Sequence, residues 1–316
     1  MPSVKKKEKK NSGNRSGWTT VILVLIMLTG IGIMAYPSVS DYWNSLHQSR
    51  AIASYSASVD SMNEDAYNKI WEEAVAYNQA FASSPISWEP SEAELEAYYQ
   101  VLDVSGTGIM GYIEIPKIGC SLPIYHSTEE SVLQIAIGHL VGSSLPVGGQ
   151  TSHCALSGHR GLPSAKLFTD LDRLVVGDVF YLRVLNETLT YEVDAIHIVE
   201  PYDLSFLALE PGKDLCTLIT CTPYGINTHR LLVRGHRIAT VVEEEATVSI
   251  TSDALRIPNR ITIPAFGIPA LFIFLFIMLI SSGRHPKGDK VFDDDRAGGT
   301  ADDTTEKEGD SNDEQT

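Results

Sequence analysis

Two long apolar runs without a charged residue constrain this chain more than any other feature of its sequence. They extend from Trp18 to Tyr36 and from Ile261 to Ser282. Each is close to the ~20 residues that an α-helix needs to cross a hydrocarbon layer of about 30 Å. Neither run has the polar face of a helix that packs on a soluble core. The sequence therefore predicts two transmembrane helices, 18–36 and 261–282, with a folded part between them.

A cleaved signal peptide is the alternative interpretation of the first run, because lysines precede it. The run is longer than the apolar region of a usual signal peptide, and Ala35-Tyr36-Pro37 lacks the small-x-small pattern of a cleavage site. An uncleaved membrane anchor is therefore favoured.

Charges on either side of the two runs predict the orientation of the chain in the membrane. Residues 1–17 contain six basic residues and one acidic residue, and Arg284, Lys287 and Lys290 follow the second run. Positive flanks stay in the cytoplasm, so both termini are expected there, with the middle of the chain on the outer face of the cell membrane. Residues 283–316 read as an acidic disordered tail. The net charge of −16 argues against a nucleic-acid partner.

The pattern of apolar residues between the two runs changes near residue 108 from helical to strand-like. Residues 37–107 are expected to form a helical extension, with helical patterning at 62–71 and 91–100. Alternating and apolar segments then predict strands in a domain 108–245, followed by a linker 246–260. Many short strands with few helices predict a closed or nearly closed β-barrel, an all-β fold.

Several elements of this barrel can be placed from local signals. The segment 127–130 has the pattern of a capping box, with Ser127 as the N-cap and Glu130 at the third helical position. Strands are expected at 111–116, 180–184, 189–193, 215–220 and 230–242, with Asn186-Glu187-Thr188 as a hairpin turn between the second and third. The stretch 200–214 is expected to be a loop beside the functional site.

The four cysteines suggest different roles. Cys216 and Cys221 are five residues apart on one predicted strand, so they point to opposite faces and should not form a disulfide with each other. Cys120 and Cys154 could form a disulfide or be buried thiols, and the sequence leaves this open. No recurring ligand spacing indicates a metal site, and no cofactor is expected.

Cys221 has the setting of a nucleophile. It ends an apolar strand and precedes the turn Thr222-Pro223-Tyr224-Gly225, which places its thiol at a strand end. If the chain returns antiparallel, Arg230 lies beside Cys221, and its permanently charged guanidinium can stabilise a developing oxyanion. The sequence thus predicts a nucleophile with an oxyanion partner on one hairpin.

A cysteine nucleophile also needs a group that transfers protons near neutral pH, and histidine is the natural one. His159 follows an apolar strand and lies between glycines in Gly158-His159-Arg160-Gly161. His229 is the local competitor, but it neighbours Arg230 on the strand and should face away from it. His159 is therefore the predicted proton-transfer residue.

Longer motifs resemble those of one enzyme family. They are the runs 217–235 (TLITCTPYGINTHRLLVRG) and 156–168 (LSGHRGLPSAKLF), together with 110–118, 138–140 and 144–149. These motifs are similar to those of the class C, pilus-assembling sortases, and the resemblance covers residues 108–240 as well as the two membrane spans.

The resemblance implies an eight-stranded sortase barrel at a Gram-positive cell surface. It also implies a cysteine transpeptidase that cleaves an LPXTG-like sorting signal between Thr and Gly and joins the acyl group to a lysine amine of another pilin subunit. By motif, Cys221 would form the thioacyl enzyme, His159 would transfer protons and Arg230 would bind the oxyanion. The pilin itself, its signal and its acceptor lysine are not readable from the sequence.

The chain departs from the family pattern in one respect. Members often have an Asp-Pro-aromatic lid motif before the barrel, and no such tripeptide occurs between residues 40 and 105. Pro85 and Trp88 are the nearest substitutes for a lid, although Trp88 could equally be an ordinary packing aromatic. Two alternatives also remain at this point: a cell-wall-anchoring sortase of another class, and a non-catalytic membrane-tethered β-domain.

Overall fold

The computed structural model of the chain describes residues 15–83 and 88–240, together with Leu271 and Phe274. The chain divides into two units, 1–262 and 263–316. Of the second unit only Leu271 and Phe274 are described, both in helical conformation, so most of the predicted span 261–282 lies outside the described residues. The following description concerns the first unit.

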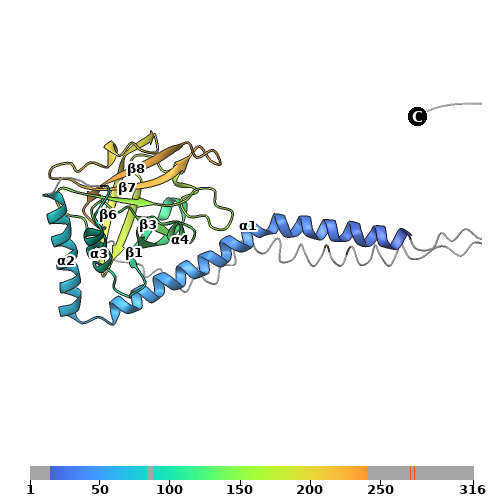
Figure 1. Cartoon of the computed structure of the whole chain (residues 1–316), viewed down its shortest axis with the longest axis horizontal. Coiled ribbons are helices and arrows are strands. Elements are labelled where there is room, and N and C mark those ends of the chain that lie inside the picture. Colours follow the sequence, from blue (N-terminus) through green and yellow to red (C-terminus); the bar gives the residue numbers. More distant parts are fainter. Residues whose placement is uncertain (1–14, 84–87, 241–270, 272–273, 275–316) are drawn as a thin grey trace, which may run out of the picture. The chain divides into compact units, whose positions relative to one another are not determined.

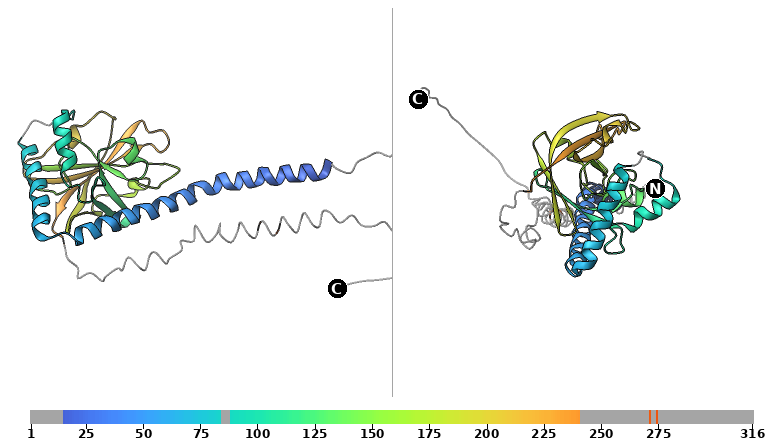
Figure 2. Two further views of the ribbon diagram at one scale, coloured as in Figure 1. Left: turned by 60° about the horizontal axis from the view of Figure 1, so that its bottom comes forward. Right: turned by 90° about the vertical axis from the view of Figure 1, so that its left-hand side faces the viewer.

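Strands form a closed β-barrel (Figure 2). The order of the eight strands around the barrel is β1-β2-β3-β4-β7-β8-β6-β5. This confirms the predicted eight-stranded all-β fold. The pairs β2–β3 and β4–β7 are parallel, and the other pairs are antiparallel. The strands are β1 Ile109–Ile115, β2 Cys120–His126, β3 Ile137–His139, β4 Ser152–Ser157, β5 Val179–Val184, β6 Glu187–Val199, β7 Asp214–Thr222 and β8 His229–Ile238.

Three helices precede the barrel, as the helical patterning predicts (Figure 1). They are α1 Arg15–Asp60, α2 Glu64–Ala82 and α3 Glu92–Gln100. Helix α2 begins where Asn63 accepts a hydrogen bond from the amide of Ala66 at 2.8 Å, and α3 begins with a capping box of Ser91 and Glu94. One-turn helices lie between the strands: α4 Glu130–Leu133, η1 Pro116–Ile118, η2 Leu171–Arg173 and η3 Ser205–Leu207.

Helix α1 contains the first predicted span. The segment Val21–Asp60 is long and apolar enough to cross a membrane: its most apolar 18 residues have a mean hydropathy of 2.1, and none of them is buried by the rest of the protein. Length and composition alone support this assignment. The helix does not end at Tyr36 but continues through Pro37 to Asp60.

Each of the three helices is attached to the barrel by a buried polar side chain. Tyr55 of α1 donates to the carbonyl of Met110 at 3.1 Å and accepts from the amide of Leu185 at 2.8 Å. Asn78 of α2 and Tyr98 of α3 make equivalent contacts with backbone groups of the barrel loops. Buried polar groups of this kind fix the position of an element because leaving them unpaired is costly.

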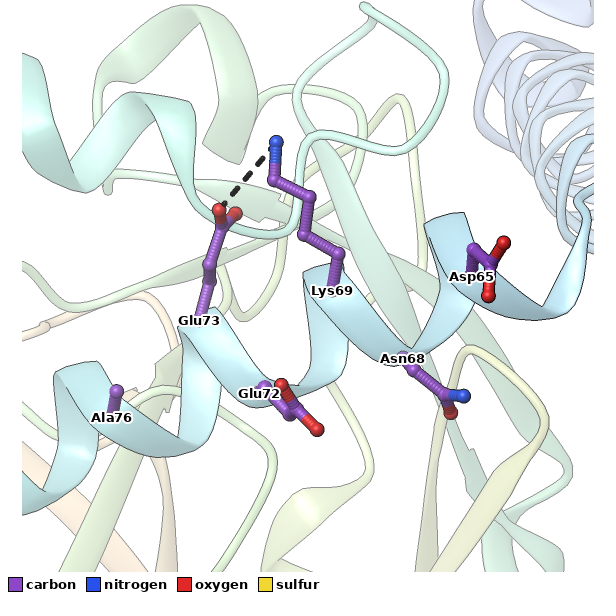
Figure 3. Close-up of a pocket in the computed structure, with 6 residues that line it drawn as sticks. All are labelled: Asp65, Asn68, Lys69, Glu72, Glu73 and Ala76. Atoms are coloured by element: carbon purple, nitrogen blue, oxygen red, sulfur yellow. Dashed lines mark ion pairs between the residues drawn. The ribbon is translucent and has the colours of Figure 1, made fainter.

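The exposed face of α2 has a shallow hollow without such contacts (Figure 3). All of its lining residues come from α2 itself, and Lys69 Nζ lies 3.8 Å from Glu73 Oε1. Exposed ion pairs contribute about 0–1 kcal/mol. The hollow is therefore a feature of one helix surface.

Three local predictions were wrong in detail. Ser127 has φ +62°, so it cannot be an N-cap, and α4 begins at Glu130 after Glu129 without a side-chain cap. The hairpin turn consists of Leu185-Asn186, because β6 already begins at Glu187. Strand β8 ends at Ile238 rather than at residue 242.

Candidate active site

Strand β7 places Cys221 on the outer surface of the barrel. Side chains alternate along a strand, and Cys216 and Leu218 belong to the barrel core. Cys221 is on the opposite face, together with Ile219, which packs in a separate apolar cluster. Cys221 is half-buried. Its position one residue before the end of β7 agrees with the sequence analysis.

Arg230 lies directly opposite Cys221. The two residues are paired in the antiparallel register of β7 and β8, so their side chains are on the same face. Opposed residues in such a pair have Cβ atoms about 4.5–5.5 Å apart. One guanidinium nitrogen, Nη1, donates to the carbonyls of Asn227 at 3.3 Å and His229 at 3.2 Å. The register thus pairs Cys221 with Arg230 across the hairpin, as the sequence analysis expects of an antiparallel return.

His159 reaches the same level of the barrel through the parallel pairing of β4 with β7. Ser157 is paired with Ile219, and the same register continued by two residues places His159 level with Cys221. Contacts beyond the strand follow this register: the amide of Gly158 donates to the carbonyl of Ile219 at 3.0 Å, and Thr220 Oγ1 donates to the carbonyl of Gly158 at 2.8 Å.

A carboxylate lies close to the imidazole of His159. Its Nε2 atom lies 3.6 Å from Oε2 of Glu130 in α4, and the His159 side chain is 28% exposed. The carbonyl of His159 accepts a hydrogen bond from the amide of Phe168 at 3.1 Å, which closes the loop behind it. In the sequence analysis Glu130 was identified only as a helical residue of the predicted capping box.

The competing histidines have other settings. His229 alternates with Arg230 on β8, and its Nε2 lies 3.4 Å from Oε1 of Glu200. His153 is buried, donates from Nδ1 to the carbonyl of Ala208 at 2.9 Å and contacts Thr217 Oγ1 at 2.7 Å. Burial lowers the pKa of His153 below its ordinary value. A buried, neutral histidine held by two partners is a structural residue.

A second apolar cluster adjoins the thiol and the guanidinium. Ile219 and Leu232 belong to it and lie two residues from Cys221 and Arg230 on the same face. We call it the outer apolar cluster; it consists of Ala155, Val199, Leu207, Ile219 and Leu232, with the partly buried Trp88, Leu140 and Leu204 packed against it.

Two segments outside the strands cover this outer apolar cluster. The loop between β6 and β7 contributes Leu204 and Leu207, so it lies beside the site as predicted. Trp88, from the segment between α2 and α3, packs on the same cluster. Pro85, the other predicted lid residue, lies outside the described residues.

All four cysteines are free thiols. Cys216 and Cys221 do not pair, as the alternation predicts. Cys154 and Cys216 are neighbours on β4 and β7 and are buried, and burial raises the pKa of the Cys216 thiol well above its usual range. Burial also raises the pKa of the Cys120 thiol to about 12. Cys154 and Cys216 are enclosed and the Cys120 thiol keeps its proton, so none of the three can readily attack a substrate, which leaves Cys221 as the best-placed nucleophile.

Within the part of the chain that the structure describes, no group of three or more His, Cys, Asp or Glu side chains could hold a metal ion. The arrangement that remains is a cysteine paired with an arginine in the strand register, a histidine level with them and an adjoining apolar surface. Such a set can carry out acyl transfer: nucleophilic attack, oxyanion binding and proton transfer.

Comparison with known proteins identifies the family. The sortase domain model matches residues 113–238. The crystal structure of sortase C1 from Streptococcus agalactiae is 54% identical, with a TM-score of 0.60, and the match covers 61% of this chain and all of that one. The structure of sortase C from Streptococcus pneumoniae is 41% identical with a TM-score of 0.54, covering 60% of this chain and 97% of that one.

The chain belongs to the sortase family, and its structural neighbours include class C sortases. A curated relative, sortase D of Bacillus subtilis strain 168, is 32% identical over 131 residues, which is 40% of this chain and 63% of the relative. The match thus spans somewhat less than two thirds of that relative's length. Cysteine transpeptidase, the enzyme class expected from the sequence, agrees with this family.

Proposed function

We propose that the chain is a membrane-anchored, pilus-assembling cysteine transpeptidase. It cleaves an LPXTG-like sorting signal of a pilin or surface protein between Thr and Gly, and it joins the acyl group to a lysine amine of another pilin subunit. The observation that carries the proposal is the common level of Cys221, Arg230 and His159 on three adjacent segments. The structural similarity to class C sortases favours pilus assembly over cell-wall anchoring.

In the first half-reaction the Cys221 sulfur attacks the Thr carbonyl carbon, and the C=O electrons move to the oxygen. Arg230 stabilises this oxyanion, because its guanidinium cannot lose its proton and lies on the thiol's face of the hairpin. Collapse of the intermediate breaks the C–N bond. His159 gives its proton to the leaving glycine amine, and a thioester remains on Cys221.

In the second half-reaction the direction of proton transfer is reversed. His159 accepts a proton from the incoming lysine amine, which attacks the thioester carbon. The C–S bond breaks, an isopeptide bond forms and Cys221 leaves as thiolate. The cycle therefore begins and ends with a thiolate on Cys221 and a protonated His159, whose Nε2 lies 3.6 Å from Oε2 of Glu130.

The outer apolar cluster supplies the binding surface for the apolar residues of the sorting signal. It adjoins the thiol on the same face, and apolar burial is the main source of affinity for such side chains. Trp88 packs on this cluster, so it acts as a lid that the substrate displaces. Pro85 belongs to the same lid segment.

The rest of the chain serves to anchor the enzyme. The spans 18–36 and 261–282 cross the cell membrane, the tails 1–17 and 283–316 are cytoplasmic, and the extension 37–107, the barrel 108–245 and the linker 246–260 lie on the outer face. The apolar stretch of α1 supports the first span.

Intact mass of the full-length protein in detergent micelles tests the proposal. After incubation with an LPXTG-type peptide, an adduct equal to the N-terminal part of the peptide is expected. Cys221→Ala must lose the adduct, and Cys120→Ala, which removes another half-buried cysteine, must retain it. Addition of a lysine-bearing pilin peptide or of a cell-wall amine then identifies the acceptor. The non-catalytic β-domain would be favoured by two results together: no peptide adduct forms, and iodoacetamide does not label Cys221 even in the Trp88→Ala variant.

A further inference from the structure

The residue that follows His159 has an unusual environment for a charged side chain. Only 10% of the Arg160 side chain is exposed, and its Nη2 pairs with Asp172 Oδ2. Its Nη1 lies 3.5 Å from Thr222 Oγ1, and the guanidinium carbon lies 5.8 Å from the centre of the Tyr224 ring. A charge is rarely buried to this extent unless several partners hold it.

The partners of Arg160 come from two separate segments. Asp172 belongs to η2, whereas Thr222 directly follows Cys221 and Tyr224 lies in the turn beyond it. The side chain therefore connects the His159 loop with the end of β7. Thr222 and Tyr224 are within three positions of Cys221, and Asp172 anchors the guanidinium from the other segment.

The backbone after Arg160 packs on the same turn. Gly161 has φ +74°, and a Cβ at this position would lie 2.9 Å from the Tyr224 ring. Glycine is required both by this backbone conformation and by this close approach. On the other side of His159, Gly158 is bonded to Ile219 and Thr220. The loop is thus fixed to β7 both before and after His159.

We propose that Arg160 is a positioning residue that holds the His159 imidazole level with the Cys221 thiol by clamping the His159 loop onto the Thr222–Tyr224 turn. The inference rests on the proposed transpeptidase function. A planar guanidinium can pair with Asp172 through one nitrogen, contact Thr222 through another and present its face to Tyr224 at the same time. A lysine ammonium is a point charge and cannot make all three contacts.

Arg160→Lys separates this role from a general contribution to folding. The role of His159 is to protonate a leaving group, so misplacing it matters only when the leaving group needs a proton. Two substrates with the same LPXT acyl part differ in this respect. The peptide amide needs a proton on its nitrogen, whereas an aryl thioester releases a thiolate that is stable without one. The ratio of single-turnover acylation rates for the two substrates therefore reports the position of His159.

In the full-length protein the amide-to-thioester rate ratio is expected to fall at least tenfold in Arg160→Lys, with the thioester rate within about threefold of the wild type. Asp172→Asn, which removes the anchor but leaves the buried guanidinium, should lower the same ratio and carries the test if Arg160→Lys does not fold. Arg173→Lys is the matched control, because Arg173 follows Asp172 in η2 and 66% of its side chain is exposed. Its ratio should stay within twofold of the wild type.

The outcomes are distinguishable. An unchanged ratio in both variants, or an equal loss of both rates, would overturn the positioning role while leaving the transpeptidase assignment intact. A wild-type protein that is acylated by neither substrate would overturn both the proposed function and this inference. A selective loss of amide cleavage in both variants supports the clamp.

Discussion

Asn78 offers a direct test of how the helical extension is attached to the barrel. It is only 5% exposed, although it lies on α2. Its Nδ2 donates to the carbonyls of Leu145 at 3.0 Å and Gly148 at 3.1 Å, and its Oδ1 accepts from the amide of Leu145 at 2.7 Å. Asn78→Leu keeps a branched side chain of similar size but removes all three hydrogen bonds.

The magnitude follows from the groups that lose a partner. The Leu145 amide is on a residue with no exposed surface, and an unsatisfied buried donor costs about 1–3 kcal/mol. The Leu145 carbonyl loses less, because it also accepts from Val147 at 2.8 Å. With the Gly148 carbonyl added and some apolar burial gained, we expect the free energy of unfolding to fall by about 2–3 kcal/mol. For a domain of this size that lowers Tm by about 4–12 °C.

Thermal unfolding of the full-length protein in detergent, followed by circular dichroism, measures this shift. The matched control is Asn68→Leu, the same substitution on the exposed face of α2 that lines the hollow of Figure 3. It should change the free energy of unfolding by no more than about 0.5 kcal/mol. If Asn78→Leu and Asn68→Leu unfold within 1 °C of each other, α2 is not held by this contact and the reasoning fails.

Three further predictions concern titration and access to the thiol. Because burial depresses the pKa of His153, the unfolded chain binds more protons below about pH 6.5, so stability should fall from pH 7 to pH 5. Chemical denaturation should show a shallower decline in His153→Gln; an equal slope would contradict this. Trp88→Ala should speed alkylation of Cys221, with unchanged labelling counting against the lid. Iodoacetamide at pH 8 should not label Cys120 in the folded protein, because its pKa is raised to about 12, and early labelling in peptide mapping would refute this.

The pairing of Cys221 with Arg230 was predictable because it is local. A strand, a short turn and a returning strand fix which residues are opposite each other, so Cys221 and Arg230 could be paired from the sequence alone. The eight-stranded barrel followed from the motifs rather than from any single strand. The relation between His159 and Cys221 depends on the parallel pairing of β4 with β7, which connects residues 62 positions apart and leaves no local signal.

Two of the three failed local predictions have a common physical cause in tertiary contacts. Ser127 has the composition of an N-cap, but its amide donates to the buried Tyr98 hydroxyl at 3.0 Å and its backbone has a positive φ. An N-cap needs an extended backbone, so α4 begins later. Leu185 occupies the hairpin turn because its amide donates to Tyr55, a residue of α1. In both cases a helix far away in the sequence determines the local conformation.

The role proposed for Arg160 could not be predicted from the motif that contains it. In the sequence it is one letter between His159 and Gly161, and its charge suggests an exposed side chain. Only the fold brings Asp172 and Thr222 to its two guanidinium nitrogens. A histidine on a loop after a strand has no covalent constraint that keeps it beside a thiol on another strand, so acyl transfer requires such a link. The contacts of Arg160 supply this link. Because Arg160 is joined to His159 by a single peptide bond, a shift of the Arg160 side chain also displaces His159.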